Sequence, residues 1–388
     1  MAAFACSPPG ESVATVARDK REPSPKANTV LFDDALAAFT SAAGETPVTQ
    51  TLDLCGSARL RLVFGSPELA AQLGPVFSHL TVDNDSGPAD FVIYAWDSAS
   101  TGVAMPPPPW STDEYGPGGE VRQPGWPRTL RVRFNLHSGV LSMVDAARRR
   151  AMWWTSNAAQ LPDYERGAPF LHLFHWWQLL LADIEQACVV HSAAVGNRDG
   201  GVLLAGRGGS GKSSTALACL AAGLRYAADD HCLLCNIDSQ PRVASLYATG
   251  KLNDEMLRRY PVFAPAVVNP QRPPEEKALL FLADAFDDRL ASAFPLRGII
   301  LPRVVPDAAE SRLIPATPSA ALQALAPSTI FLFRPVGNEG AALLARLAQA
   351  TRRLPAFHLE LGARADAKRV PELVAELLAR LESGTPNV

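Results

Sequence analysis

The feature that most constrains this chain is a glycine-rich loop at positions 206–213. It has the form G-x-x-x-x-G-K-S, which is the pattern of a phosphate-binding loop, or Walker A motif. An apolar segment at 202–205 precedes the loop and predicts a strand. Residues 212–222 predict a helix, which Gly223 ends. A strand, a glycine-rich turn and a helix in this order are typical of a loop that binds phosphate at a helix N-terminus.

Each residue type in this loop has a chemical task. Glycine lets the main chain adopt unusual conformations and approach phosphate oxygens closely. Consecutive N–H groups then form an anion-binding nest, to which the helix dipole adds partial positive charge. Lys212 would place a cation on the β- and γ-phosphates of ATP, and the Ser213 hydroxyl would ligate Mg²⁺. The predicted nucleotide-binding residues are Gly206, Arg207, Gly208, Gly209, Ser210, Gly211, Lys212, Ser213 and Ser214.

Two adjacent acidic residues, Asp229 and Asp230, are the next candidates. They lie within residues 226–235, whose composition predicts a strand. Because side chains alternate on a strand, the two carboxylates are expected to differ in task, one holding the metal ion and the other facing an acceptor hydroxyl. Two carboxylates beside polyphosphate repel it unless a metal ion or a proton intervenes. A metal-plus-base unit is therefore favoured over an Asp-Asp pair that only opens a turn.

His191 is the third candidate, on a predicted strand at 188–195. A single histidine on a strand is most often a core residue. Adjacent parallel strands, however, would bring His191 to the crevice at the strand ends, where the loop and the two aspartates are expected. The order of strand, loop, helix and strand predicts a largely parallel α/β core.

The remaining segments predict a smaller domain before this core. Alternation of apolar and polar residues predicts strands at 59–64 and 128–134, and residues 91–96 predict a more buried strand. Further predicted elements are a helix at 66–79, a long loop at 105–127, a helix at 169–183, strands at 296–301 and 329–333, a helix start at Thr317-Pro318, and a last helix whose apolar stripe, 370–381, packs on the core. The predicted division is a flexible tail at 1–28, an α+β domain at 29–165 and the nucleotide-binding domain at 166–388.

Composition excludes several classes of function. A formal net charge of −3 and a pI near 6.2 argue against a protein that binds nucleic acid. No apolar run approaches the roughly 20 residues that span a bilayer. The six cysteines are scattered, which fits a reducing cytoplasm. Cys232 and Cys235 have C-x-x-C spacing, but they lie in an apolar segment without a second ligand pair, so buried thiols are favoured over zinc.

The candidate residues together resemble a known family. The unit His191…Gly206-x-x-x-x-Gly211-Lys212-Ser213…Ala228-Asp229-Asp230 resembles the catalytic core of HPr kinase/phosphorylase and its relatives, which is similar to the nucleotide core of phosphoenolpyruvate carboxykinase. The resemblance covers residues 188–304. The His-Ser-Ala-Ala-Val strand and the segment Ser245-Leu-Tyr-Ala-Thr-Gly-Lys251-Leu252 are most similar to the HPr-kinase-related serine kinases found with lasso-peptide biosynthesis.

This resemblance implies an α/β fold with a P-loop core of the carboxykinase and HPr-kinase kind, and a kinase that transfers the γ-phosphoryl group of ATP. The acceptor would be a serine hydroxyl of a peptide or protein. The implied catalytic residues are Asp229 as general base, His191 in support of the acidic site, and Lys212. Asp230 and Ser213 would hold Mg²⁺, and Lys251 would contact phosphate or acceptor. The resemblance is also compatible with a homo-oligomer.

Two positions depart from the family pattern. Ser214 stands where the bifunctional enzymes have an acidic residue, and residues 295–298 lack the glutamate of their Glu-x-Arg-Gly motif. These departures count against the reverse phosphorylase reaction and against HPr as the acceptor. Two alternatives stay open, a small-metabolite kinase of the same fold and a nucleotide-binding regulatory module without transfer activity. The set of His191, Asp229 and Asp230 favours an enzyme, because a switch needs no base.

Overall fold

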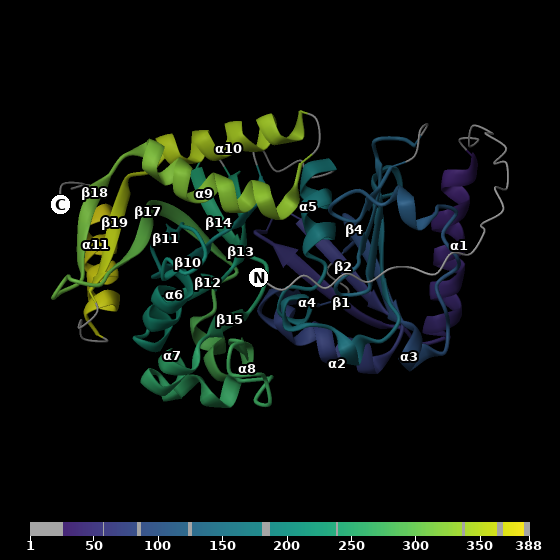
Figure 1. Cartoon of the computed structure of the whole chain (residues 1–388), viewed down its shortest axis with the longest axis horizontal. Coiled ribbons are helices and arrows are strands. Elements are labelled where there is room, and N and C mark those ends of the chain that lie inside the picture. Colours follow the sequence, from purple (N-terminus) through teal and green to yellow (C-terminus); the bar gives the residue numbers. More distant parts are fainter. Residues whose placement is uncertain are drawn as a thin grey trace, which may run out of the picture.

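The chain folds around two mixed β-sheets with helices on their faces, so it is an α/β protein (Figure 1). The structure is a computed structural model that describes residues 26–56, 58–83, 87–122, 126–180, 187–237, 240–335, 338–362 and 368–383. Within these ranges, no helix combines the length and the apolar character needed to cross a membrane. Helix α1 (Lys26–Ala43) begins inside the tail predicted at 1–28, and residues 1–25 lie outside the described ranges.

The N-terminal half contains an eight-stranded sheet in the order β3-β1-β2-β4-β8-β7-β6-β5. The strands predicted at 59–64, 91–96 and 128–134 are confirmed as β2, β4 and β6. The bounds are β1 (Val48–Leu54), β2 (Ala58–Phe64), β3 (Thr81–Val82), β4 (Phe91–Asp97), β5 (Glu120–Val121), β6 (Leu130–Asn135), β7 (Val140–Asp145) and β8 (Arg150–Thr155).

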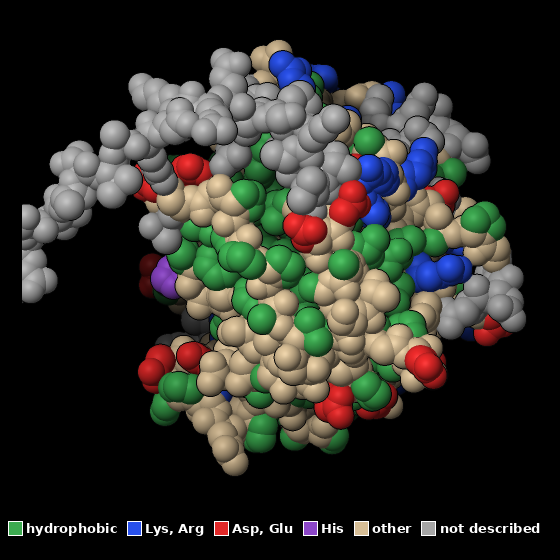
Figure 2. Space-filling model, turned by 90° about the vertical axis from the view of Figure 1, so that its right-hand side faces the viewer, with side chains coloured by type: hydrophobic (Ala, Val, Ile, Leu, Met, Phe, Trp, Pro, Cys, Tyr) green, Lys and Arg blue, Asp and Glu red, His purple; other side chains and the backbone are tan. Residues whose placement is uncertain are grey.

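Helices cover both faces of this sheet. Helix α1 packs Phe32 and Phe39 against Trp96 and Met152 on one face, and it forms the outer edge of the molecule in Figure 1. The other face is covered by α2 (Pro67–Leu73), the 3₁₀ turn η1 (Gly74–Leu80) and α5 (Leu171–Leu180), with α3 (Ser98–Thr101) and α4 (Asp163–Gly167) at the margins. Figure 2 views the molecule from the α1 end, where hydrophobic side chains, other uncharged side chains and backbone fill the middle of the surface and charged side chains lie mainly around it.

The C-terminal half contains the second sheet, with β12-β10-β11-β17-β14-β13-β9 in order, β19 beside β17 and β18 beside β19. Among the strand pairs of the described residues in this sheet, β11–β17 and β17–β19 are parallel and the others antiparallel, so the prediction of a largely parallel core is wrong. The turn at 197–200 joins β10 to β11, and such a short connection permits only antiparallel pairing. The bounds are β9 (Cys188–His191), β10 (Ala193–Gly196), β11 (Gly201–Leu204), β12 (Arg225–Ala228), β13 (His231–Ile237), β14 (Gln240–Ser245), β17 (Ala293–Val305), β18 (Arg312–Ala316) and β19 (Ala356–Gly362).

Four helices enclose the second sheet in a three-layer arrangement. Helices α6 (Lys212–Ala221) and α11 (Arg369–Glu382) pack on one face, and α9 (Pro318–Phe333) and α10 (Glu339–Arg353) on the other. Thr317 caps α9 as predicted, by accepting the N–H of Ala320. The strand predicted at 329–333 is wrong, because these residues form the last turns of α9. Their β-branched and aromatic composition favours a strand, but the buried Thr329 and Phe333 lie one helical turn apart and pack inward.

The two halves share one hydrophobic core. Phe77 and Phe170 stack in parallel with centroids 5.9 Å apart, and Phe77 also contacts Tyr247 of the C-terminal half. The Tyr247 hydroxyl donates to the Pro169 carbonyl at 2.8 Å. Further elements follow β14 in the chain and lie in the lower part of Figure 1. They are β15 (Thr249–Leu252), α7 (Asp254–Arg259), the 3₁₀ turn η5 (Pro261–Ala266), β16 (Ala278–Phe281) and α8 (Ala283–Phe286).

Candidate functional site

The predicted phosphate loop joins β11 to α6, as the sequence pattern requires. Gly211 caps α6 with φ 106°, a left-handed conformation that favours glycine. A Cβ atom at this position would also lie 2.4 Å from the Leu361 side chain. Gly211 is therefore needed for two reasons, its backbone conformation and the close approach of β19.

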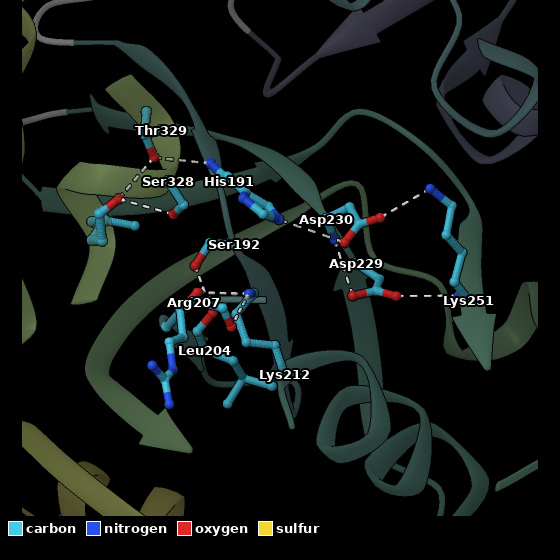
Figure 3. Close-up of polar contacts among 12 residues, drawn as sticks. His191, Ser192, Leu204, Arg207, Lys212, Asp229, Asp230, Lys251, Ser328 and Thr329 are labelled. Carbon is cyan, nitrogen blue, oxygen red and sulfur yellow. Dashed lines mark hydrogen bonds and ion pairs between the residues drawn. The ribbon is translucent and has the colours of Figure 1, made fainter. Parts of the chain in front are cut away.

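Lys212 is folded under the loop. Its side chain is almost fully buried, and its Nζ donates to the carbonyl oxygens of Gly206 at 2.7 Å and Arg207 at 3.3 Å. Burial lowers the pKa of Lys212, while the charges of Asp230 and Asp229 oppose this shift. The ammonium group thus sits at the centre of the loop, beside the acidic pair. The Arg207 side chain extends away from the carboxylates (Figure 3).

Asp229 and Asp230 lie at a sharp bend between β12 and β13, not inside one strand as predicted. Asp230 has φ 67°, and a left-handed residue of this kind interrupts a strand. Before the bend, strand β12 pairs with β10. After the bend, strand β13 pairs with β9 instead. The two carboxylates therefore point in different directions because of this bend, rather than because of strand alternation.

Asp229 points inward and is held by three donors. Its carboxylate accepts the main-chain N–H of Asp230 at 3.0 Å and that of Lys251 at 3.2 Å, and the Ser213 hydroxyl is a further hydrogen-bond partner. Burial, followed by the negative charge of Asp230, raises the pKa of Asp229 to about 6. This carboxyl group is therefore the one in the pair that can exchange a proton near neutral pH.

Asp230 points outward and pairs with two basic side chains. The Lys251 Nζ atom lies 3.2 Å from its Oδ2 atom, and the His191 Nε2 atom lies 3.7 Å from its Oδ1 atom (Figure 3). Burial alone would raise the pKa of Asp230, but the His191 ring and the Lys251 charge outweigh it and hold this pKa well below its usual value. Asp230 therefore stays ionised while Asp229 can carry a proton.

His191 reaches the acidic pair by a different route from the one predicted. The predicted strand at 188–195 is two strands, β9 and β10, that part at Ser192. Strand β9 lies at the sheet edge, antiparallel to β13, with His191 opposite His231. The rings of His191 and His231 stack with centroids 5.8 Å apart. His191 therefore meets Asp230 across an antiparallel pair.

A cavity of about 490 Å³ opens over the loop. Residues from the loop and the acidic site line it together, namely Gly208, Gly209, Gly211, Lys212, Ser213, Ser214, Asp230 and His191. Asp229 lies behind Asp230 and is 4% exposed. The far wall includes Met256, Arg259 and Lys277. These residues carry no motif spacing, so they could not be identified from the sequence.

The acidic site suits a hard cation such as Mg²⁺. The described residues contain no cluster of three or more His, Cys, Asp and Glu arranged as a metal cage. Mg²⁺ needs no such cage, because it usually binds one or two carboxylates together with substrate phosphates and water. Ser213, Asp229 and Asp230 offer oxygen ligands. The pKa of Asp229 is raised first by burial and then by the negative charge of Asp230, and a bound cation would relieve the repulsion between the two carboxylates.

Comparisons with known proteins add little to this geometry. No protein-family model matches the chain, and no curated protein matches it. A solved structure described as the HPr(Ser) kinase/phosphatase from Coxiella burnetii is similar to 50% of this chain and 93% of its own, with 12% sequence identity and a TM-score of 0.29. A likeness at this TM-score supports no inference about activity.

Proposed function

We propose that this chain is an ATP-dependent phosphotransferase with a P-loop core of the HPr-kinase kind, acting on a serine hydroxyl of a peptide or protein. One observation carries the proposal. The glycine-rich loop with its buried lysine, Asp230 and His191 come from separate segments and line one cavity, and the buried Asp229 lies directly behind Asp230. A loop that only turned the chain would need neither the acidic pair nor the histidine.

The loop and Lys212 would bind and orient the triphosphate. The first residues of α6 line the cavity, and a helix N-terminus favours phosphate. The Lys212 ammonium group already lies within the loop, where it donates to the Gly206 carbonyl. When nucleotide binds, it would turn toward the β- or γ-phosphate. Phosphoryl transfer depends mainly on such positioning and charge neutralisation, not on covalent chemistry by the protein.

The two carboxylates would divide the remaining work. Asp229, with a pKa of about 6, would accept the proton of the attacking serine hydroxyl. Asp230, which stays ionised, would hold Mg²⁺ together with Ser213. When bound, Mg²⁺ would neutralise charge on the β- and γ-phosphate oxygens. His191 would hold the Asp230 carboxylate in place from the side of β9.

A transfer assay tests the proposal. The purified protein would be incubated with γ-labelled ATP, Mg²⁺ and separate pools of serine-containing peptides and hydroxyl metabolites, and mass spectrometry would locate the label. Label on peptide serine supports the proposal, and K212A should abolish it. Label only in the metabolite pool would indicate a small-metabolite kinase. Bound ATP without label in either pool would indicate a nucleotide-binding regulatory module and contradict transfer.

A further inference from the structure

Two strands bend beside the cavity, and the bends are bonded to each other. Strand β9 turns into β10 at Ser192, and β12 turns into β13 at Asp229 and Asp230. The main-chain N–H of Ser192 donates to the carbonyl oxygen of Asp230 at 3.0 Å. The position of Asp230 is therefore tied to the bend that follows His191.

Ser192 also connects this bend to the phosphate loop. Its side chain is fully buried, and its hydroxyl donates to the carbonyl oxygen of Leu204 at 2.7 Å. Leu204 is the last residue of β11, directly before the residues that lead into the loop. One buried serine thus links the strand entering the loop with the acidic bend.

Thr329 holds the same region from the opposite side. Strand β9 lies at the edge of its sheet, and the outward N–H groups of a buried edge strand need partners. The Thr329 hydroxyl of α9 accepts the main-chain N–H of His191 at 3.1 Å and donates to the Leu325 carbonyl at 3.0 Å (Figure 3). Thr329 is fully buried, so no water replaces it.

We infer that Thr329 and Ser192 are positioning residues, whose buried hydroxyls fix His191 and Asp230 relative to the loop. The inference rests on the proposed function. Neither residue faces the reacting groups, so both act through the residues they hold. The separation of 3.7 Å between His191 Nε2 and Asp230 Oδ1 is already long for a hydrogen bond. A small shift of the His191 main chain would lose this contact.

The first test uses the shape of the threonine side chain. Valine replaces threonine with nearly the same volume but without the hydroxyl, whereas serine keeps the hydroxyl. We expect T329V to lower kcat of peptide phosphorylation about tenfold, with the dissociation constant for ATP within about twofold of wild type. T329S should keep kcat within about twofold. S192A should lower kcat by an amount similar to that of T329V.

A matched control separates positioning from general loss of stability. Thr351 of α10 is also buried and donates to the Ala348 carbonyl at 3.2 Å, away from the site. T351V should lower the melting temperature about as much as T329V does while leaving kcat unchanged. A double-mutant cycle with H191A adds a second readout. If Thr329 acts through His191, T329V should lower kcat no further in the H191A background.

The outcomes distinguish this inference from the proposed function. If wild-type protein transfers no label to any peptide or metabolite, the proposed function fails and this inference fails with it. If wild-type protein is active and T329V matches T351V in kcat, the proposed function stands and the positioning role of Thr329 is overturned. Full additivity of T329V and H191A would also overturn it.

Discussion

Lys251 contacts Asp230 through its side chain, with Nζ 3.2 Å from Oδ2. The main-chain N–H of the same residue donates to Asp229 at 3.2 Å. One residue of β15 therefore holds both carboxylates, but it places its positive charge on only one of them. Lys251 lowers the pKa of both carboxyl groups. Burial and the charge of Asp230 outweigh it at Asp229, whose pKa is raised to about 6, whereas the pKa of Asp230 is held well below its usual value.

The first prediction concerns this lysine. K251M removes the charge but keeps the main-chain N–H and most of the aliphatic side chain. Without the ammonium group the pKa of Asp230 should rise, because a cation that favours its ionised form is lost. The same ammonium group also lowers the pKa of the proposed base Asp229, so its loss should raise that pKa too. We therefore expect the acid limb of the rate profile to move to higher pH and the rate at low pH to fall about tenfold. An unchanged acid limb would contradict this role.

The second prediction separates the two carboxylates. D229N keeps the shape of the side chain but cannot accept a proton, so kcat should fall by a factor of about 100 or more while ATP binding stays nearly intact. D230N should instead raise the Mg²⁺ concentration needed for half-maximal activity. Measuring the rate of both variants as a function of Mg²⁺ concentration gives kcat and the half-maximal Mg²⁺ concentration for each. If D229N raised the Mg²⁺ requirement and D230N lowered kcat instead, the two roles would be exchanged. Asp229, which is hydrogen-bonded to Ser213, would then be the Mg²⁺ ligand.

The third prediction concerns the backbone of the loop. G211A places a Cβ at a left-handed residue and against Leu361, so it should destabilise the protein by about 1–3 kcal/mol. G208A is the matched control, because a Cβ there meets nothing within 4 Å. Denaturant unfolding of both variants measures the difference. Equal free energies of unfolding for G211A and G208A would show that the loop does not have this conformation.

Several elements of the fold could be predicted because local patterns coincide with packing. The stripe at 370–381 became α11, with Leu373, Val374, Leu377 and Leu378 buried against the core. The mostly antiparallel pairing of the second sheet was only partly accessible. The short turn at 197–200 indicates an antiparallel β10–β11 pair, but the β13–β9 and β14–β17 pairs join segments that are distant in the chain. The end of α9 was predicted as a strand because five residues give too short a window to reveal a helical period.

In the site, too, residues within a short motif could be predicted, whereas contacts between distant parts of the chain could not. The loop pattern identified Lys212 and Ser213 because the chemistry needs those types at that spacing. The sequence allows an Asp-Asp turn at Asp230 but favours a strand, because aspartate, although enriched at positive φ, adopts it at only a minority of positions. Thr329 lies far from His191 in the chain, so only the fold brings its hydroxyl to that N–H. Cys232 and Cys235 are buried, as predicted.

The fourth prediction concerns stability at acid pH. Burial lowers the pKa of His79, which is hydrogen-bonded to Ser245, to about 4, compared with about 6.5 in an unfolded chain. Between these values the unfolded state binds the proton and the folded state does not. The free energy of unfolding should therefore fall as pH is lowered from about 6.5 to 4. H79Q keeps a polar partner for Ser245 and should make this fall shallower.

The exposed His137 provides the control for this prediction. H137Q replaces a histidine on the surface rather than in the core, and it should leave the dependence of stability on pH as it is in wild-type protein. Urea unfolding at several pH values between 4 and 7 would compare the three proteins. An identical slope for H79Q and wild type would exclude His79 from the acid response.

The central claim is that the loop and the acidic pair act on the terminal phosphate of one nucleotide. A crystal structure with Mg²⁺ and a non-hydrolysable ATP analogue tests it most directly. We predict the γ-phosphate on the loop amides, in contact with Lys212, with Asp229 and Asp230 each within a hydrogen bond or one bridging water of it or its metal ion. A nucleotide bound elsewhere, or both carboxylates turned away from the γ-phosphate, would contradict the account.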